Sequence, residues 1–278
     1  VPAERSGRGA PVTRAPASTG AERRAWVEQI MGMPISIHIR GEGARSRALE
    51  EPVRAAFDDL RAAEDRFSAY RPDSEISRIQ RGEQALEQSS ADVREVAQLC
   101  REALHRTNGV FDAWHCTPER PGAFDPTGLV KTWAVARAAG RFASLPERRL
   151  AWAIVAGGDV LARDIPAPGN TEADGWRIGI EDPADRSRVL AAVPLRDGGV
   201  CTSGTAARGS HIVDPRDGQS AREIVVQATV AAPSVVWADV WATALVAMGE
   251  EARTRTASLA GTSGLLVFAD RQTHRWAN

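Results

Sequence analysis

The first clear pattern in this chain is an alternation of apolar and polar residues. Ile35, Ile37 and Ile39 are separated by polar side chains, and this period of two is typical of a half-buried strand. Farther along, apolar residues recur at steps of four and three from Leu49 to Phe67, which predicts a long amphipathic helix. The chain therefore begins its ordered part with a strand followed by a helix.

Three further helices are predicted by the same spacing. Pro72 prevents the first helix from continuing. A second helix carries the apolar residues of 93–104 and is closed by Asn108-Gly109. A third runs from about Gly128 to about Gly140, and a last one follows Pro233-Ser234 and reaches about Met248.

The second half of the chain is rich in predicted strands. They are separated by turn sequences at Asp182-Pro183, Asp197-Gly198-Gly199 and Asp217-Gly218. This order, with helices first, then strands and then a closing helix, predicts an α+β fold and not βαβ alternation. The predicted strands are Ala151–Ala156, Trp176–Glu181, Val189–Leu195, Glu223–Ala231 and Leu265–Phe268.

The tail and the bulk composition set limits on the class of protein. Residues 1–24 are rich in Pro, Ala, Arg, Gly, Ser and Thr, which predicts a disordered tail before one domain over residues 25–278. A formal net charge of -1 argues against nucleic-acid binding. The three scattered cysteines, Cys100, Cys116 and Cys201, favour neither a disulfide framework nor a zinc site.

The sequence also bears on location. Membrane anchoring is not evident, because no apolar run reaches membrane-spanning length. The chain as given predicts a cytoplasmic protein, and a leader removed before Val1 would place it outside the cytoplasm instead.

Lys131 is the single lysine, so all but one of the 35 lysines and arginines are arginine. A solvated surface charge can be either residue, whereas a compact ammonium and a wide guanidinium differ in a confined site. Lys131 follows Asp125 and Gly128 at the start of a predicted helix. Either its ammonium has a role that arginine would not serve, or it is a chance survivor on a helix surface.

Asp239 and Thr243 lie four residues apart on the last predicted helix, so their side chains share one face. A carboxylate and a hydroxyl are hard oxygen ligands of the kind that Mg²⁺ prefers. The alternative is structural, since an Asp in a first turn suits the helix dipole and a Thr can bond a backbone carbonyl.

Two further segments carry candidate chemistry. Gly157-Gly158-Asp159 follows a predicted strand, and it is either a loop that approaches a ligand, with Asp159 bonding ligand hydroxyls, or simply a tight turn. His211 lies at a predicted strand end before an Asp-Pro turn. It could relay a proton near neutral pH, or it could be a hairpin histidine with no catalytic duty.

Taken together, the ordered motifs of this chain resemble those of the ApbE family, the FAD:protein FMN transferases. The resemblance spans roughly Ile30 to Met248. It rests on Met31-Gly32, Arg66 to Tyr70, Ser74 to Ser77, Gly109 to Asp112, Asp125 to Val135, Ala156 to Asp159, Ser203-Gly204, His211 to Pro215, Ala238-Asp239 and Ala242 to Leu245.

The resemblance implies a Mg²⁺-dependent enzyme with FAD as its substrate. Such an enzyme moves the FMN half of FAD onto a threonine or serine of an acceptor protein, and AMP leaves. Carried over by position, the metal would be held by Gly128, through its carbonyl, with Asp239 and Thr243. His211 and Lys131 would be catalytic. The FAD site would be lined by Met31, Tyr70, Asp112, Ala113, Trp114, Asp125, Lys131, Asp159 and Ile212.

Some positions depart from the family pattern. Thr132 and Asp217 stand where the family usually has glycine and threonine, and Met33 replaces a common threonine. Two other functions are compatible with the same pocket, an FAD pyrophosphatase that releases FMN and AMP and a non-catalytic flavin-binding protein. No acceptor-like threonine motif occurs in the chain, which predicts that modification takes place in trans.

Overall fold

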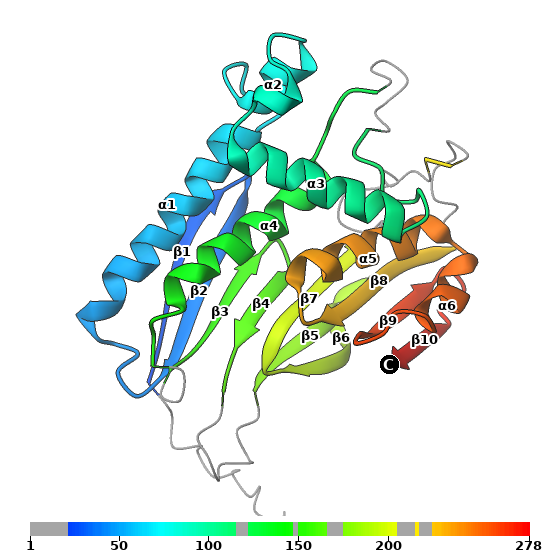
Figure 1. Ribbon diagram of the computed structural model, residues 1–278. Coiled ribbons are helices and arrows are strands. Elements are labelled where there is room, and N and C mark those ends of the chain that lie inside the picture. Colours follow the sequence, from blue (N-terminus) through cyan, green and yellow to red (C-terminus); the bar gives the residue numbers. More distant parts are fainter. Residues whose placement is uncertain (1–21, 115–121, 147–149, 166–174, 205–214, 217–223) are drawn as a thin grey trace, which may run out of the picture.

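A computed structural model gives the arrangement of the chain (Figure 1). It describes residues 22–114, 122–146, 150–165, 175–204, 215–216 and 224–278.

Among the described residues, eight strands form one sheet in the order β1-β2-β3-β4-β7-β8-β9-β10, and all neighbouring pairs are antiparallel. Two more strands, β5 and β6, form a separate hairpin. The strands are β1 Arg23–Ile30, β2 Met33–Gly41, β3 Leu150–Ala156, β4 Asp159–Arg163, β5 Trp176–Asp182, β6 Asp185–Leu195, β7 Asp197–Gly204, β8 Val225–Ala232, β9 Ser263–Phe268 and β10 Thr273–Ala277.

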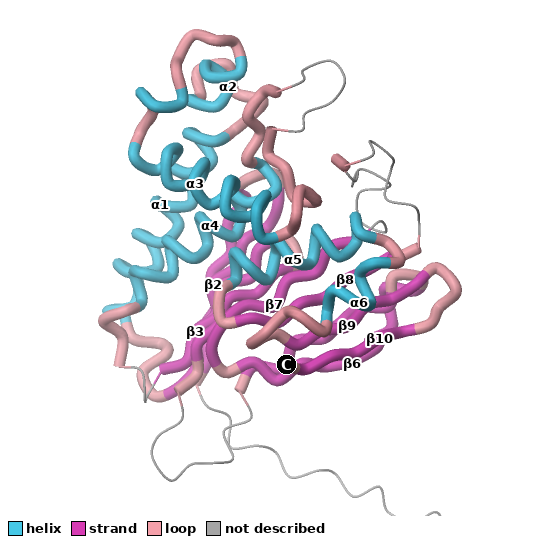
Figure 2. The backbone as a smooth tube through the Cα atoms, turned by 45° about the vertical axis from the view of Figure 1, so that its right-hand side comes forward, coloured by secondary structure: helices cyan, strands magenta, loops and turns pink. Residues whose placement is uncertain are grey.

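The helices form a layer over one face of the large sheet (Figure 2). Ile35, Ile37 and Ile39 of β2 are fully buried in the core that this layer covers, together with Leu60 and Phe67. The helices are α1 Glu50–Phe67, α2 Glu75–Gln80, α3 Ala91–Arg106, α4 Thr127–Ala139, α5 Val235–Met248 and α6 Glu251–Thr256, with short 3₁₀ turns at Arg47–Leu49, Leu86–Gln88 and Gly140–Phe142.

The β5–β6 hairpin covers the opposite face of the large sheet. On β3, Ile154 belongs to the helix-side core, whereas its neighbour Ala153 packs with Leu195 of β6. Leu265 of β9 likewise packs with Ile180 of β5. This follows from the period of two, because successive side chains of a strand point to opposite faces. The result is three layers, with helices, sheet and hairpin in that order.

The predicted α+β class is confirmed, and the four long predicted helices are present with ends shifted by a few residues. The first described strand, β1, begins at Arg23, and residues 1–21 of the predicted tail lie outside the described residues. One predicted turn was wrong. Asp197-Gly198-Gly199, predicted as a turn, instead opens β7, where Gly199 pairs with both Leu161 and Ala232.

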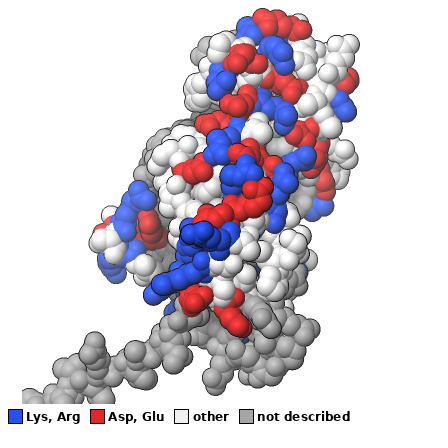
Figure 3. Space-filling model, turned by 90° about the vertical axis from the view of Figure 1, so that its left-hand side faces the viewer, with Lys and Arg blue, Asp and Glu red and all other residues white. Residues whose placement is uncertain are grey.

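Charges of both signs intermingle on the face that Figure 3 shows. This agrees with a chain that carries 35 basic and 36 acidic residues. No helix among the described residues is long and apolar enough to cross a membrane.

Candidate active site

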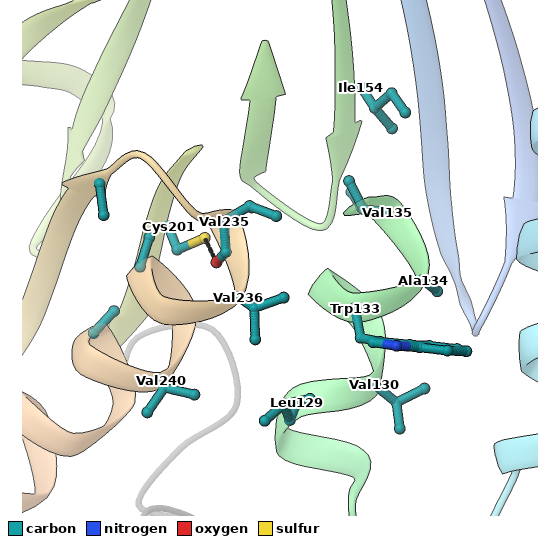
Figure 4. Close-up of a cluster of buried hydrophobic side chains, with 14 of the residues drawn as sticks. Leu129, Val130, Trp133, Ala134, Val135, Ile154, Cys201, Val235, Val236 and Val240 are labelled. Carbon is teal, nitrogen blue, oxygen red and sulfur yellow. Dashed lines mark hydrogen bonds between the residues drawn. The ribbon is translucent and has the colours of Figure 1, made fainter. Parts of the chain in front are cut away.

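Two helices from distant parts of the sequence lie side by side in the helix layer. Leu129, Val130 and Trp133 of α4 and Val236 and Val240 of α5 belong to the same buried core (Figure 4). This apolar packing fixes α4 against α5 and brings polar residues from both helices together. The site is built at this junction and on the strands beneath it.

Lys131 of α4 occupies the centre of the site. Its ammonium forms an ion pair with Asp159 of β4 and lies 3.8 Å from Oδ2 of Asp239 on α5. The two acidic residues are only 3% and 4% exposed, and the side chain of Lys131 is 23% exposed. Buried charges of this kind are costly unless paired, so the three side chains stabilise one another.

The same surroundings fix the protonation state of the lysine. Burial alone would lower the pKa of Lys131, but the carboxylates of Asp239 and Asp159 outweigh it and raise the pKa well above the ordinary lysine value. Lys131 therefore remains an ammonium at every working pH. Its predicted role as a positive charge in the site agrees with this environment.

Asp159 owes its position to a two-residue hairpin between β3 and β4. Gly157 and Gly158 have φ values of 58° and 99°, in the region that glycine adopts without strain. Asp159 then starts β4, opposite Ala156. Its Oδ1 accepts a 3.0 Å hydrogen bond from the backbone N–H of Thr202.

The glycine pair forms a tight turn in the structure, and Asp159 holds Lys131 and the neighbouring strand β7 from a buried position. Its predicted contact with ligand hydroxyls stays a prediction.

Asp239 and Thr243 lie one turn apart on α5, as their spacing predicts. Oδ2 of Asp239 accepts a 2.9 Å hydrogen bond from the hydroxyl of Thr132 on α4. The hydroxyl of Thr243 lies 3.0 Å from that of Ser203 on β7. Three elements therefore hold the proposed pair of ligands.

The donor set around Asp239 is suited to a hard cation. It consists of carboxylate and hydroxyl oxygens, which Mg²⁺ prefers. A sulfur also lies nearby, that of Cys201, within 4.8 Å of the carboxylates of Asp159 and Asp239. Burial, followed by those two carboxylates, raises the pKa of Cys201 well above its ordinary value, and its thiol donates to the carbonyl of Val235 at 3.4 Å. A thiol sulfur is a soft donor, unlike the oxygens that Mg²⁺ prefers.

Gly128 lies in the first turn of α4, one turn before Thr132. A side chain there would come within 3.3 Å of the ring of Phe111, so the glycine allows the preceding loop to lie close to the helix. Its role as a carbonyl ligand stays a prediction.

The other residues predicted to line the FAD site come from three loops. Met31 lies in the β1–β2 turn with a φ of 55°, and its N–H donates to Oε1 of Glu64 at 2.8 Å. Met33 reaches the Gly157 backbone, so this turn and the β3–β4 turn lie at the same end of the sheet. Tyr70, after α1, is 96% exposed.

Asp112, Ala113, Trp114 and Asp125 form a connected set before α4. Asp112 Oδ1 accepts from the N–H of Trp114 at 2.8 Å, the carbonyl of Ala113 accepts from the N–H of Asp125 at 2.8 Å, and Asp125 Oδ1 accepts from the N–H of Thr127 at 3.0 Å. These bonds tie the loop to the start of α4 and hence to the region of Lys131.

A surface hollow of about 520 Å³ lies beside this loop. Trp114 and Phe124 line it, with their rings 5.1 Å apart. Ile79 and Leu86 add apolar side chains to the wall, and Gln80 adds a polar one.

His211 and Ile212, the predicted base and one predicted FAD-lining residue, lie outside the described residues. The sequence did not single out Thr132 and Ser203 as parts of the site, although both lie inside quoted motifs. A hydroxyl adjacent to the lone lysine was the available clue to Thr132.

Comparisons with known proteins point to one family. The profile of the ApbE family matches residues 31–118 and 116–266. The FAD:protein FMN transferase of Klebsiella pneumoniae (strain 342) is 33% identical over 121 residues, which are 40% of this chain and 33% of that protein. The one of Escherichia coli (strain K12) is 32% identical over 108 residues, 36% of this chain and 30% of that protein. The chain thus spans about a third of the length of the curated relatives it matches.

Solved structures share the fold over nearly the whole chain. The ApbE protein of Thermotoga maritima has a TM-score of 0.74 at 20% identity and covers 91% of this chain and 97% of its own. The flavin transferase ApbE of Vibrio cholerae has a TM-score of 0.73 at 23% identity and covers 93% and 97%. The two matched segments of the family profile cover most of the chain and include Lys131, Asp159, Asp239 and Thr243. This chain therefore belongs to the ApbE family.

Proposed function

We propose that this protein transfers the FMN half of FAD onto a threonine or serine hydroxyl of an acceptor protein, in a Mg²⁺-dependent reaction. The acceptor oxygen forms a new bond to the phosphorus of the FMN half. The pyrophosphate P–O bond breaks, AMP leaves with that bridging oxygen, and the hydroxyl proton passes to a base.

One observation carries this proposal. Lys131, Asp239 and Thr243, chosen from the sequence as cation and metal ligands, come from α4 and α5 and lie within one small part of the molecule. Proteins named FAD:protein FMN transferases are relatives of this chain, and their name describes the transfer of FMN from FAD to a protein.

The chain's own residues supply the charges that phosphoryl transfer requires. Attack on a pyrophosphate needs positive charge near the non-bridging oxygens and a stabilised leaving phosphate. Lys131 stays protonated, and Asp159 holds its ammonium in place. It is therefore a fixed positive charge for the diphosphate.

Asp239 and Thr243 would hold the Mg²⁺, with Gly128 contributing a carbonyl. When bound there, the ion would neutralise charge that develops on the phosphate oxygens. Ser203 restricts the Thr243 hydroxyl, and Thr132 restricts the Asp239 carboxylate.

His211 is the proposed base for the acceptor hydroxyl. An unperturbed imidazole titrates near neutrality, and a general base contributes about 10²–10⁴-fold to a rate. The FAD site would be completed by Met31, Tyr70, Asp112, Ala113, Trp114, Asp125, Asp159 and Ile212.

The test is a transfer assay with FAD, Mg²⁺ and a candidate flavin-carrying acceptor domain. We expect covalent fluorescence of the acceptor in a denaturing gel, a mass gain equal to FMN, and AMP in step with it. Asp239→Ala should abolish metal-dependent turnover. Rapid release of FMN and AMP without any acceptor would identify an FAD pyrophosphatase instead, and stable yellow protein without turnover would identify a flavin-binding protein.

His211→Ala separates chemistry from binding. We expect it to bind FAD like the wild type, as followed by flavin fluorescence quenching, and to lose transfer by about 10²–10⁴-fold. Loss of FAD binding with normal residual turnover would instead make the histidine structural.

A further inference from the structure

We infer that Thr132 is a positioning residue that presets the orientation of the Asp239 carboxylate for a divalent cation. The inference rests on the proposed function and extends it to a residue outside the predicted ligand set. Thr132 is completely buried in α4, and no ligand needs to touch it for the effect.

The hydroxyl of Thr132 has two oxygen neighbours. Its Oγ1 lies 2.9 Å from Oδ2 of Asp239 and 3.2 Å from the carbonyl of Leu129. A threonine inside a helix commonly bonds the carbonyl three or four residues back. Here the shorter contact is to the carboxylate, and a charged acceptor makes the stronger hydrogen bond, so the single proton is donated to Asp239.

Consecutive residues of α4 act on the same oxygen in different ways. The Lys131 ammonium lies 3.8 Å from Oδ2 of Asp239, beyond hydrogen-bonding distance, while the Thr132 hydroxyl lies at 2.9 Å. Lys131 supplies charge with little direction, whereas a hydrogen bond is directional. Anchoring Oδ2 limits rotation of the carboxylate about its Cβ–Cγ bond, and this sets the plane in which both oxygens lie.

The surroundings make this anchor hard to replace. Asp239 is 4% exposed and Thr132 is 0% exposed, so bulk water does not reach the hydrogen bond. The two helices that carry them pack against each other through apolar side chains (Figure 4). A buried carboxylate that loses a donor keeps the desolvation penalty without the compensating bond, and its orientation is no longer preset.

Groups that orient metal ligands from outside the coordination sphere typically change metal affinity by about 10–100-fold when removed. We therefore expect Thr132→Val, which keeps the shape but lacks the hydroxyl, to weaken Mn²⁺ binding by about 10–100-fold. Thr132→Ser, which keeps the hydroxyl, should retain the wild-type affinity. Mn²⁺ is titrated into the whole chain without FAD and followed by electron paramagnetic resonance.

Thr256→Val is the matched control. Thr256 is 1% exposed, and its hydroxyl bonds the carbonyl of Arg253 at 2.8 Å in α6. This variant loses a buried threonine hydroxyl remote from Asp239, and we expect Mn²⁺ binding unchanged. Circular dichroism melting of every variant checks folding. Should Thr132→Val not fold, Thr132→Ala against Thr132→Ser makes the comparison, since these two differ only by the hydroxyl.

A second reading uses turnover. If the substitution weakens only metal affinity, a higher Mg²⁺ concentration restores flavin transfer by Thr132→Val toward the wild-type rate. If the substitution misfolds the site, added Mg²⁺ does not restore transfer. The inference is overturned if Thr132→Val binds Mn²⁺ as tightly as the wild type, or if Thr132→Ser binds it as weakly as Thr132→Val. It is also overturned if the wild type binds no Mn²⁺.

The two proposals fail separately. If the wild type transfers no FMN but its Mn²⁺ affinity still depends on the Thr132 hydroxyl, the proposed function is wrong and the positioning role stands. If the wild type transfers FMN and Thr132→Val binds Mn²⁺ as tightly as the wild type does, the positioning role is wrong and the proposed function stands.

Discussion

Lys131 carries a positive charge into a part of the helix layer where two carboxylates are buried. Asp159 and Asp239 lie on different elements and point toward the same ammonium. The guanidinium of arginine is wider and planar, and the short hairpin that places Asp159 leaves little freedom to accommodate it. The shape of the ammonium, as well as its charge, is therefore a structural reason for a lysine at position 131.

Lys131→Arg tests whether the compact ammonium is needed. We expect the variant to fold but to transfer FMN at least about tenfold more slowly, because a misplaced positive group would lose the contact with the diphosphate that we propose for Lys131. Rates under saturating FAD and Mg²⁺ give the result. A wild-type rate would mean that any cation serves at this position.

Lys131→Met tests the ion pair itself. Removing one partner of a buried pair leaves the other charge uncompensated, which typically costs about 3–5 kcal/mol. We expect urea unfolding to show a loss of this size, and a smaller loss in the double variant Lys131→Met/Asp159→Asn. Equal losses in the single and double variants would contradict the pairing.

The stability lost in Lys131→Met should not depend on pH near neutrality. The pKa of Lys131 is raised in the folded protein, so its stabilisation is complete below the unfolded lysine value and disappears only as the pH rises through the folded one. We therefore expect the difference between wild type and Lys131→Met to stay constant from about pH 6 to about pH 9.

At the level of elements, the contact between β7 and α5 sets where the proposed metal ligands lie. A Cβ on Gly199 would come within 2.5 Å of the Cα of Val235, the first residue of α5. Glycine at this strand position therefore permits the helix that carries Asp239 and Thr243 to approach the sheet closely.

We expect Gly199→Ala to push α5 from the sheet, with a loss of about 1–3 kcal/mol of stability, the usual cost of overpacking, and with weaker Mn²⁺ binding. Gly179→Ala on β5 is the control, because its Cβ would meet only Val189 atoms at 3.6 Å. Urea unfolding and the Mn²⁺ titration are compared for both. Equal behaviour of the two variants would show that the close approach has no consequence.

The elements that the sequence predicted best are those with long apolar periods. The helix that became α5 begins after Ser234 and ends at Met248 as expected, and its spacing placed Asp239 and Thr243 on one face. Short strands were harder to predict. In β4 only five residues, Asp159–Arg163, form the strand, and two glycines at the start of β7 resembled a turn.

The contact between Thr132 and Asp239 was beyond prediction for a different reason, although the family resemblance implied that Lys131 and Asp239 share one site. Thr132 and Asp239 are 107 residues apart, and no local period relates them. Their contact depends on how α4 and α5 pack over the sheet. The sequence could identify the residues with reactive groups but not the hydrogen bond between them.

For the whole molecule, the site lies over the middle of the sheet. β4 and β7 are central in the strand order, while β1 and β10 are its edges. Backbone groups in the most enclosed elements usually open only with global unfolding. Hydrogen exchange followed by mass spectrometry should show slow exchange for β4, β7 and α5 and faster exchange for β1 and β10. Edge strands that exchange more slowly than β4 and β7 would contradict this ordering.

The β5–β6 hairpin has a simple relation to these central strands. β4 and β7 pair directly, with Arg163 opposite Asp197, and the N–H of Asp164 donates to the carbonyl of Arg196. In topological terms the residues between are an insertion at the tip of a β4–β7 hairpin. Changes engineered at the turn between β5 and β6 would therefore alter the outer face of the sheet, while Asp159 and Lys131 keep their places on its inner side.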